Sequence, residues 1–261
     1  MILEEIAART RVRVEEEKQQ ISLEEMKKMA NEMDANTGFP FRKAIGKESL
    51  SFLSEVKKAS PSKGLIAEKF PYIEIAKDYE KAGAAAISCL TEPYYFQGSD
   101  QYLTEITKQV SIPVLRKDFV VDEYQIYQAK VIGASAVLLI CAILDRETIK
   151  AYIKIAESLG LDALVEAHDE KEIEDAIGAG AKIIGVNNRN LKDFTVDITN
   201  SIRLRKFVPK EILFVSESGM KTAEDIKKLK ENGIDAVLIG ETLMRSENKK
   251  EMLETLNGGP L

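Results

Sequence analysis

The chain has 261 residues, of which 44% are hydrophobic and 31% charged, and its formal net charge at pH 7 is −6. This is a globular composition with enough apolar material for a core, and its spread-out acidic excess argues against a nucleic-acid-binding surface. An anionic small molecule would have to be bound by a local cluster of cations.

Residues 1–45 are expected to form a helical extension that packs on the rest of the chain. Leu3, Ile6 and Ala7 share one helical face, and a charged stretch separates them from apolar positions in residues 23–29. The segment is too short and too charged to hold a core of its own. It also has no apolar stretch of the kind found in a secretory signal.

After residue 45 the sequence repeats a loose pattern, in which a helical stretch ends at glycine and a short apolar run follows. The glycines are Gly83, Gly133, Gly160, Gly180 and Gly233. Glycine adopts a positive φ at little cost, so it ends a helix and turns the chain into a strand. The runs that follow are almost continuously apolar, which is typical of parallel strands buried on both faces.

Amphipathic helical segments lie between the apolar runs. Three of these segments are residues 71–81, 145–159 and 222–232. Three further strands are expected at residues 50–58, 112–117 and 211–217. Together with the runs after the glycines they make eight candidate strands, each followed by a candidate helix.

Regular alternation of strand and helix predicts parallel pairing through right-handed crossovers. We therefore predict a single α/β domain over residues 1–261, in which residues 46–257 form a (β/α)8 TIM barrel and residues 1–45 form its helical extension. A doubly wound open sheet is the alternative. The first strand is not followed by G-x-G-x-x-G, which weakens that alternative.

The two cysteines, Cys89 and Cys141, both lie in apolar, strand-like runs and are expected to be free thiols. With a single histidine they offer no metal-ligand spacing. The longest apolar run, residues 136–144, is too short to cross a bilayer. We expect a cytoplasmic enzyme with no metal or nucleotide cofactor and no membrane partner.

The carboxyl ends of barrel strands build the active site of this fold, so polar residues at these ends are candidate site residues. They include Glu55, Lys57, Lys117, Glu166 and Asn187. Glu55 and Lys57 are two residues apart on one strand and therefore face the barrel interior together. Five such groups at one mouth would repel or desolvate one another unless they served a ligand.

Four other polar residues at strand ends receive a different interpretation. Lys58, Arg116 and Asp118 are expected to face outward or toward solvent. His168 lies two residues after Glu166, where the strand should be ending, and we assign it a structural role.

The last two strands predict a phosphate site. Ser218-Gly219-Met220 closes the seventh strand, and Ile239-Gly240-Glu241-Thr242 closes the eighth. Backbone N–H groups at these two places form the common phosphate pocket of the fold, and glycine lets the backbone approach the anion closely.

The same strand ends resemble those of the indole-3-glycerol-phosphate synthase family. The matching motifs are Glu55-x-Lys57-x-Ala-Ser60-Pro-Ser-x-Gly64, Leu90-Thr91-Glu92 leading to Tyr95-Phe96-x-Gly98, Arg116-Lys117-Asp118-Phe119, Glu166-x-His168, Asn187-Asn188-Arg189 and Glu217-Ser218-Gly219. They occur in register from about residue 45 to residue 245, and the helical extension is similar too.

The resemblance implies ring closure of 1-(2-carboxyphenylamino)-1-deoxyribulose 5-phosphate to indole-3-glycerol phosphate, with loss of carbon dioxide and water, in tryptophan biosynthesis. The chain ends soon after the eighth strand, so we expect a monofunctional enzyme. We also expect a monomer or a weak homodimer.

The catalytic residues implied by the resemblance are Lys117, Glu166, Lys57, Glu55, Asn187, Glu217 and Ser218. Lys117 is the expected general acid, with a pKa lowered by crowding against Lys57 in a partly dry site. Glu166 is the expected base in the dehydration, and Glu55 helps to hold the proton network. Lys57 pairs with substrate anions and is a candidate late proton donor.

The substrate-binding residues implied by the resemblance are Ser60, Phe96, Phe119, Arg189, Gly219, Leu238, Gly240 and Glu241. Arg189 is expected to bind the anthranilate carboxylate, and the two phenylalanines to form a slot for the aromatic ring. Glu241 stands where a serine often occurs in the family. Its backbone N–H can still donate to a phosphate, but its carboxylate must turn away from that anion.

Two rival functions remain at this point. One is a phosphate-binding barrel of the phosphoribosylanthranilate isomerase type, which would need a cysteine and an aspartate as acid and base. The other is a non-catalytic barrel that only binds a phosphorylated ligand or another protein.

Overall fold

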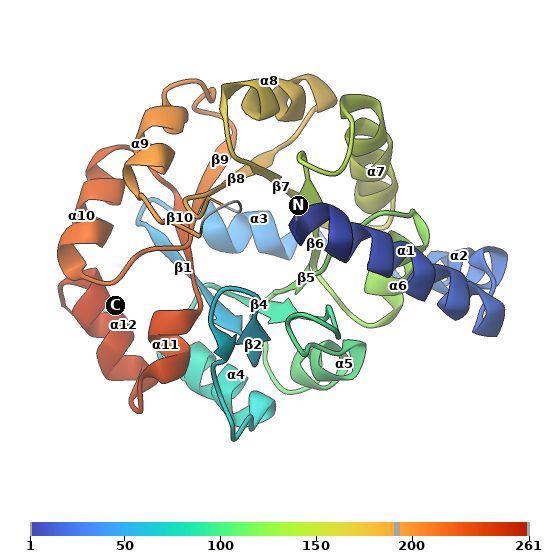
Figure 1. The fold of residues 1–261 in the computed structure, drawn as a ribbon, viewed down its shortest axis with the longest axis horizontal. Coiled ribbons are helices and arrows are strands. Elements are labelled where there is room, and N and C mark those ends of the chain that lie inside the picture. The colour runs from blue at the N-terminus through green and yellow to red at the C-terminus, as the bar shows by residue number, and fades with distance from the viewer. Residues whose placement is uncertain (1, 191–193, 260–261) are drawn as a thin grey trace.

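The computed structural model describes residues 2–190 and 194–259. Eight parallel strands close into a barrel in the ring order β1-β10-β9-β8-β7-β6-β5-β4 (Figure 1). They are β1 (Ser51–Val56), β4 (Ala86–Leu90), β5 (Val114–Lys117), β6 (Ala136–Ile140), β7 (Asp162–Ala167), β8 (Ile183–Asn187), β9 (Leu213–Glu217) and β10 (Ala236–Ile239). The closed ring confirms the predicted (β/α)8 barrel and rules out the open sheet.

Helices surround the barrel and connect its strands. They are α4 (Tyr72–Lys81), α5 (Asp100–Thr107), α6 (Tyr124–Val131), α7 (Arg146–Ser158), α8 (Glu170–Ala179), α9 (Thr199–Arg205), α10 (Ala223–Glu231), α11 (Glu241–Arg245) and α12 (Lys249–Asn257). Asp145, Asp169 and Thr222 cap three of them by accepting a hydrogen bond from a backbone N–H three residues on. The five glycines of the sequence repeat all have φ between 73° and 91°, as helix-ending glycines require.

The amino-terminal segment is helical, as expected, and it packs at more than one place on the barrel. It forms α1 (Ile2–Gln20), α2 (Leu23–Asn31) and α3 (Pro40–Ile45). Phe41 and Ile45 of α3 are fully buried in the inner core, and Arg42 pairs with Asp162 at the start of β7. The first turns of α1 lie over the middle of the barrel in Figure 1, at the end opposite α3.

The core has two shells because side chains on a strand alternate between its faces. Leu53, Leu115 and Leu164 point into the barrel and belong to the inner cluster. Val56 and Ile87 point outward and pack under the helices. Burial on both faces explains why the strand sequences are continuously apolar. None of the described helices is long and apolar enough to span a membrane.

The segment after β1 contains a short antiparallel hairpin that the sequence did not predict. It pairs β2 (Ala59–Ser60) with β3 (Gly64–Leu65). Gly64 has a φ of 62°, which lets the chain turn back between the two strands. The hairpin places Ser60 and Lys63 at the mouth of the barrel.

Candidate active site

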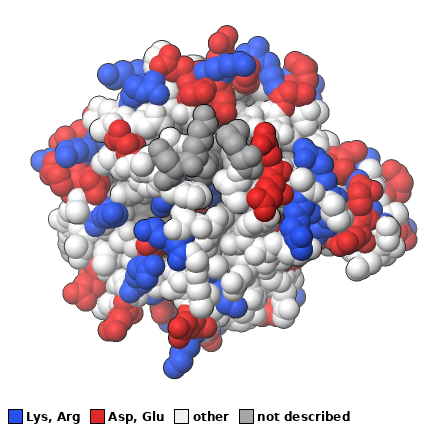
Figure 2. All heavy atoms as spheres, in the orientation of Figure 1, with Lys and Arg blue, Asp and Glu red and all other residues white. Residues whose placement is uncertain are grey.

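A cavity of about 540 Å³ lies at the carboxyl ends of the strands. All the site residues predicted from the sequence line it except Glu217, which is buried against Lys117. The lining therefore includes Glu55, Lys57, Ser60, Phe96, Lys117, Phe119, Glu166, Asn187, Arg189, Ser218, Gly219, Leu238, Gly240 and Glu241. Ile2, Leu3 and Ile6 of α1 complete the wall. Figure 2 shows acidic and basic side chains intermixed over this face of the molecule.

Lys117, at the end of β5, lies between two carboxylates. Its Nζ is 3.1 Å from Oε2 of Glu166 and 2.9 Å from Oε2 of Glu217, and its side chain is 12% exposed. Burial alone would lower the pKa of Lys117, but the charges of Glu166, Glu217 and Glu55 outweigh it and raise the pKa above its usual range. The expectation of a lowered pKa was wrong, because carboxylates and not Lys57 are the closest charges.

The two carboxylates on Lys117 differ from each other. Burial and the neighbouring Glu166 raise the pKa of Glu217 to about 7, although Lys117 opposes the shift. Burial would raise the pKa of Glu166 too, but Lys117, His168 and a hydrogen bond from Asn187 lower it. Lys117 and His168 therefore favour the ionised form of Glu166, whereas burial beside Glu166 favours the protonated form of Glu217.

Two glycines leave space for the carboxylates of Glu217 and Glu55. A Cβ on Gly185, inside β8, would overlap the carboxylate of Glu217. A Cβ on Gly240 would overlap the carboxylate of Glu55, which pairs with Lys57. The strand-end motifs assigned Gly240 only to the phosphate pocket, and a site role for Gly185 was not predicted. A glycine inside an apolar strand is itself a signal of close approach by another group.

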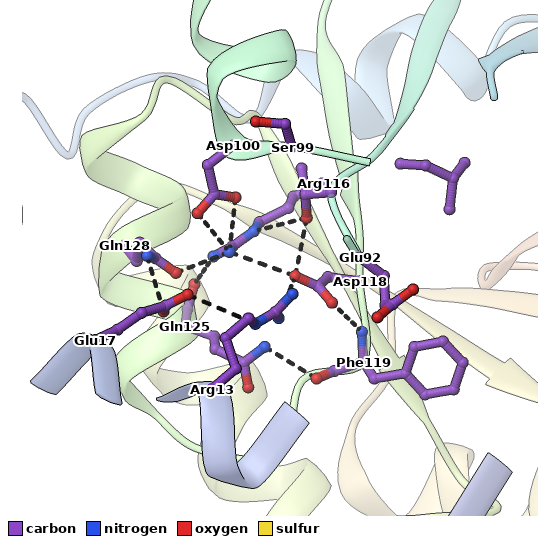
Figure 3. A network of polar contacts seen from close by, with 12 residues as sticks. Arg13, Glu17, Glu92, Ser99, Asp100, Arg116, Asp118, Phe119, Gln125 and Gln128 are labelled. Carbon is purple, nitrogen blue, oxygen red and sulfur yellow. Dashed lines mark hydrogen bonds and ion pairs between the residues drawn. The ribbon is translucent and has the colours of Figure 1, made fainter. Parts of the chain in front are cut away.

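Arg116 and Asp118, on either side of Lys117, form a buried polar network under α1 (Figure 3). Arg13 of α1 donates to Asp118 at 2.8 Å, and Arg116 donates to Asp100 at 2.8 Å and to Gln128 at 2.7 Å. Arg116 points away from the barrel interior, as expected, whereas Asp118 also lies on the cavity wall, and neither side chain is solvated. Each is only 1% exposed, because α1 and α5 cover them.

The same network positions the aromatic slot. Asp118 accepts a hydrogen bond from the Phe119 N–H at 2.8 Å. Glu92 accepts from the backbone N–H groups of Tyr94, Tyr95 and Phe96 at 2.7–3.0 Å, which shapes the loop after β4. The rings of Phe96 and Phe119 then lie with their centroids 6.2 Å apart on the wall of the cavity.

The predicted phosphate pocket lies at the ends of β9 and β10. Ser218 and Gly219 have φ values of 68° and 99°, which turn their backbone out of the strand direction. The Glu241 carboxylate is held by Lys63 at 3.5 Å and Arg245 at 3.2 Å. Two cations thus pair with this carboxylate, which belongs to a residue of the cavity wall.

Asn187 and Arg189 are joined at the end of β8. The side-chain oxygen of Asn187 accepts a hydrogen bond from the Arg189 N–H at 3.1 Å, which fixes the amide group beside Glu166. The Arg189 guanidinium donates to the Phe194 carbonyl at 3.3 Å and lies on the cavity wall.

The two cysteines lie outside the cavity wall. Cys89 and Cys141 are free thiols, burial raises the pKa of each, and neither lines the cavity. An isomerase that used a cysteine and an aspartate as acid and base therefore has no candidate cysteine in this cavity. Within residues 2–190 and 194–259, no three or more His, Cys, Asp and Glu side chains are arranged to hold a metal ion.

A family model described as indole-3-glycerol phosphate synthase matches residues 3–256. The chain belongs to the indole-3-glycerol phosphate synthase family. The resemblance deduced from the strand ends is thereby confirmed.

Curated relatives with the indole-3-glycerol phosphate synthase name match almost the whole chain. The protein from Ruminiclostridium cellulolyticum is 61% identical and covers 99% of both chains. The protein from Endomicrobium trichonymphae is 56% identical over 98% of this chain and 99% of the relative.

Solved structures outside the indole-3-glycerol phosphate synthase family share the barrel. The 3-hexulose-6-phosphate synthase of Salmonella typhimurium superposes with a TM-score of 0.66 at 14% identity, over 80% of this chain and 97% of that one. KGPDC of Streptococcus mutans gives a TM-score of 0.63 at 12% identity, over 80% and 97%. At this identity the likeness establishes the fold alone.

Proposed function

We propose that this chain converts 1-(2-carboxyphenylamino)-1-deoxyribulose 5-phosphate to indole-3-glycerol phosphate, carbon dioxide and water in tryptophan biosynthesis. One observation carries the proposal: the Lys117 ammonium lies between two carboxylates in the cavity that also contains Lys57, Arg189 and the glycines of the anion pocket. Lys117 is then an acid and Glu166 a base, and they lie beside one site for the substrate carboxylate and another for the substrate phosphate.

Lys117 acts in the first step. The ring carbon that carries the carboxylate attacks the ketone carbon, and a C–C bond forms. The ketone oxygen receives the Lys117 proton and becomes a hydroxyl. A raised pKa keeps Lys117 charged at neutral pH, so its proton is present when negative charge develops on that oxygen.

Carbon dioxide leaves next, and its bonding electrons restore the aromatic ring. The hydroxyl then departs as water with a proton from Lys57, while Glu166 removes a proton from the carbon next to the nitrogen, which creates the indole double bond. Because Glu166 contacts Lys117 at 3.1 Å, the proton it gains can return to Lys117. Glu55 holds Lys57 through their ion pair, and one further proton comes from solvent.

Binding groups surround these reacting atoms. The phosphate is held by Ser60 and by the backbone N–H groups of Gly219, Gly240 and Glu241. Arg189 pairs with the substrate carboxylate, since a guanidinium matches its two oxygens. The remaining contacts are Phe96, Phe119 and Leu238 to the apolar parts of the substrate, and Asn187 and Ser218 to its hydroxyls.

We further propose that the protein acts as a monomer or weak homodimer in the cytoplasm, without metal or nucleotide cofactor. Its 261 residues form one domain, with residues 1–45 as the extension and residues 46–257 as the barrel.

The test is a fluorescence assay for indole formation by the purified protein supplied with the carboxyphenylamino sugar phosphate. The expected result is a rise in indole fluorescence that saturates with substrate, with one carbon dioxide released per product. Turnover of phosphoribosylanthranilate without indole formation would instead establish the isomerase reaction. Binding without turnover of either compound would establish a non-catalytic barrel.

A further inference from the structure

His168 is the only histidine of the chain and follows Glu166 at the end of β7. Its Nδ1 lies 3.0 Å from Oε2 of Glu172 in α8, and its backbone N–H donates to the same oxygen at 2.7 Å. Its Nε2 faces Oε1 of Glu166 at 3.5 Å, is buried, and has no hydrogen-bond partner among the described residues. Each ring nitrogen thus faces a carboxylate.

This arrangement favours the doubly protonated ring. A neutral imidazole has one N–H donor and one nitrogen with a lone pair, so one carboxylate would face a lone pair. An imidazolium presents a donor to both carboxylates. The orientation of the ring is fixed from the Glu172 side, because that carboxylate holds both the ring and the backbone.

The charged groups around the ring also favour its doubly protonated form. Glu166 faces it from β7, Glu172 from α8, and Glu217 acts on it from β9. Cys141, which follows β6 and donates to the Glu172 carbonyl at 3.6 Å, is a neutral thiol with a raised pKa. On the α9 side the contact is uncharged, from the Asn200 amide to the His168 carbonyl. Burial lowers the pKa of His168, but the carboxylates outweigh it and the net shift is upward.

We propose that His168 is a positioning residue for the reaction proposed above, and that its imidazolium holds the Glu166 carboxylate ionised and correctly oriented for its role as base. The two oxygens of Glu166 are divided between two cations, with Oε2 on Lys117 and Oε1 toward His168. When Lys117 has given up its proton, His168 is the cation that remains beside Glu166. The inference rests on the proposed base role of Glu166.

A direct test observes the ring itself. Because the chain has one histidine, a protein labelled with ¹⁵N-histidine and prepared without a histidine tag gives one pair of ring-nitrogen NMR signals. We expect an imidazolium at pH 7 and a titration midpoint above the ordinary value of about 6.5. We also expect Glu166→Gln and Glu172→Gln each to lower the midpoint. A titration midpoint at or below about 6.5, or one that Glu166→Gln leaves unchanged, would overturn the inference.

The second test measures turnover against pH. In His168→Asn, kcat should fall about tenfold with KM within about twofold, and the acid limb of the kcat profile should move up by about 1 pH unit, because an opposite charge has been removed from beside Glu166. In a Glu166→Gln background the same change should have no further effect on kcat. Asp169→Asn is the matched control, since it removes a charge from the next residue while retaining the α8 cap, and its acid limb should not move.

These outcomes separate the inference from the proposed function. If wild-type protein forms no indole, the proposed function fails, and the NMR titration still decides whether His168 is coupled to Glu166. If the wild type is active and His168→Asn lowers only thermal stability or kcat without moving the acid limb, His168 is merely structural and the inference fails alone.

Discussion

The Lys117 ammonium and the Glu217 carboxylate meet at 2.9 Å although 100 residues separate them in the chain. The barrel brings them together because β5 and β9 both end at the same mouth. Glu217 does not simply neutralise Lys117. It shares the limited space with Glu166, and its raised pKa makes it the carboxyl group in this cluster that changes charge near neutral pH.

That raised pKa predicts how Glu217 affects stability. Between the ordinary pKa of 4.5 and the folded value of about 7, the unfolded chain loses the proton while the folded chain retains it, so the free energy of unfolding falls as pH rises. Glu217→Gln removes this penalty. Relative to wild type, the variant should gain on the order of 3 kcal/mol between pH 4.5 and pH 8. Urea unfolding at several pH values measures the difference in free energy of unfolding between the variant and the wild type. If this difference does not change with pH, the pKa of Glu217 is the same in the folded and the unfolded chain.

Gly185 should be required for the position of Glu217. Gly185→Ala places a methyl group where the carboxylate lies, so we expect kcat to fall by about tenfold or more and the free energy of unfolding to drop by about 1–3 kcal/mol. The control is Glu217→Ala, in whose background Gly185→Ala should cost much less stability. If both backgrounds lose the same stability, the overlap is with the strand itself and not with Glu217.

The network under α1 should contribute to stability through Arg13. Arg13→Met leaves Asp118 buried without its α1 partner, and we expect a loss of about 3 kcal/mol in the free energy of unfolding. KM should rise as well, because the first turns of α1 line the cavity. Arg11→Met on the exposed side of the same helix is the matched control and should change stability by less than about 0.5 kcal/mol. Equal losses for both variants would show that the Arg13–Asp118 ion pair does not contribute to stability.

How far the sequence alone predicted the structure depended on how local each signal was. The strands and the barrel followed from glycine-ended helices and continuous apolar runs, which are properties of neighbouring residues. The convergence of Glu55, Lys57, Lys117 and Glu166 followed from the rule that strand ends share one mouth. These predictions needed no side-chain distances.

Two of the wrong predictions depended on distances that no sequence pattern contains. Asp118 is buried by Arg13, which is 105 residues away in the chain and arrives only when α1 docks. The pKa of Lys117 was predicted in the wrong direction because its closest neighbours are carboxylates and not Lys57. The assigned roles of the site residues remain predictions, which Arg189→Ala and Lys117→Ala test.

Arg189 is predicted to pair with the substrate carboxylate. Arg189→Ala should therefore weaken binding of the carboxylated substrate by about 10-fold or more, a loss of about 1.5 kcal/mol or more, and weaken binding of a decarboxylated analogue much less. Calorimetric titration of both ligands gives the comparison. An equal loss for the two ligands would place the carboxylate at another cation.

The most direct measurement is the turnover of Lys117→Ala. If Lys117 is the general acid, kcat should fall about 10³-fold while the dissociation constant of the substrate stays within about tenfold of wild type. Lys58→Ala, one residue beyond Lys57 at the end of β1, is the matched control and should retain kcat within about twofold. A Lys117→Ala enzyme that forms indole at the wild-type rate would contradict the central claim that Lys117 is the general acid.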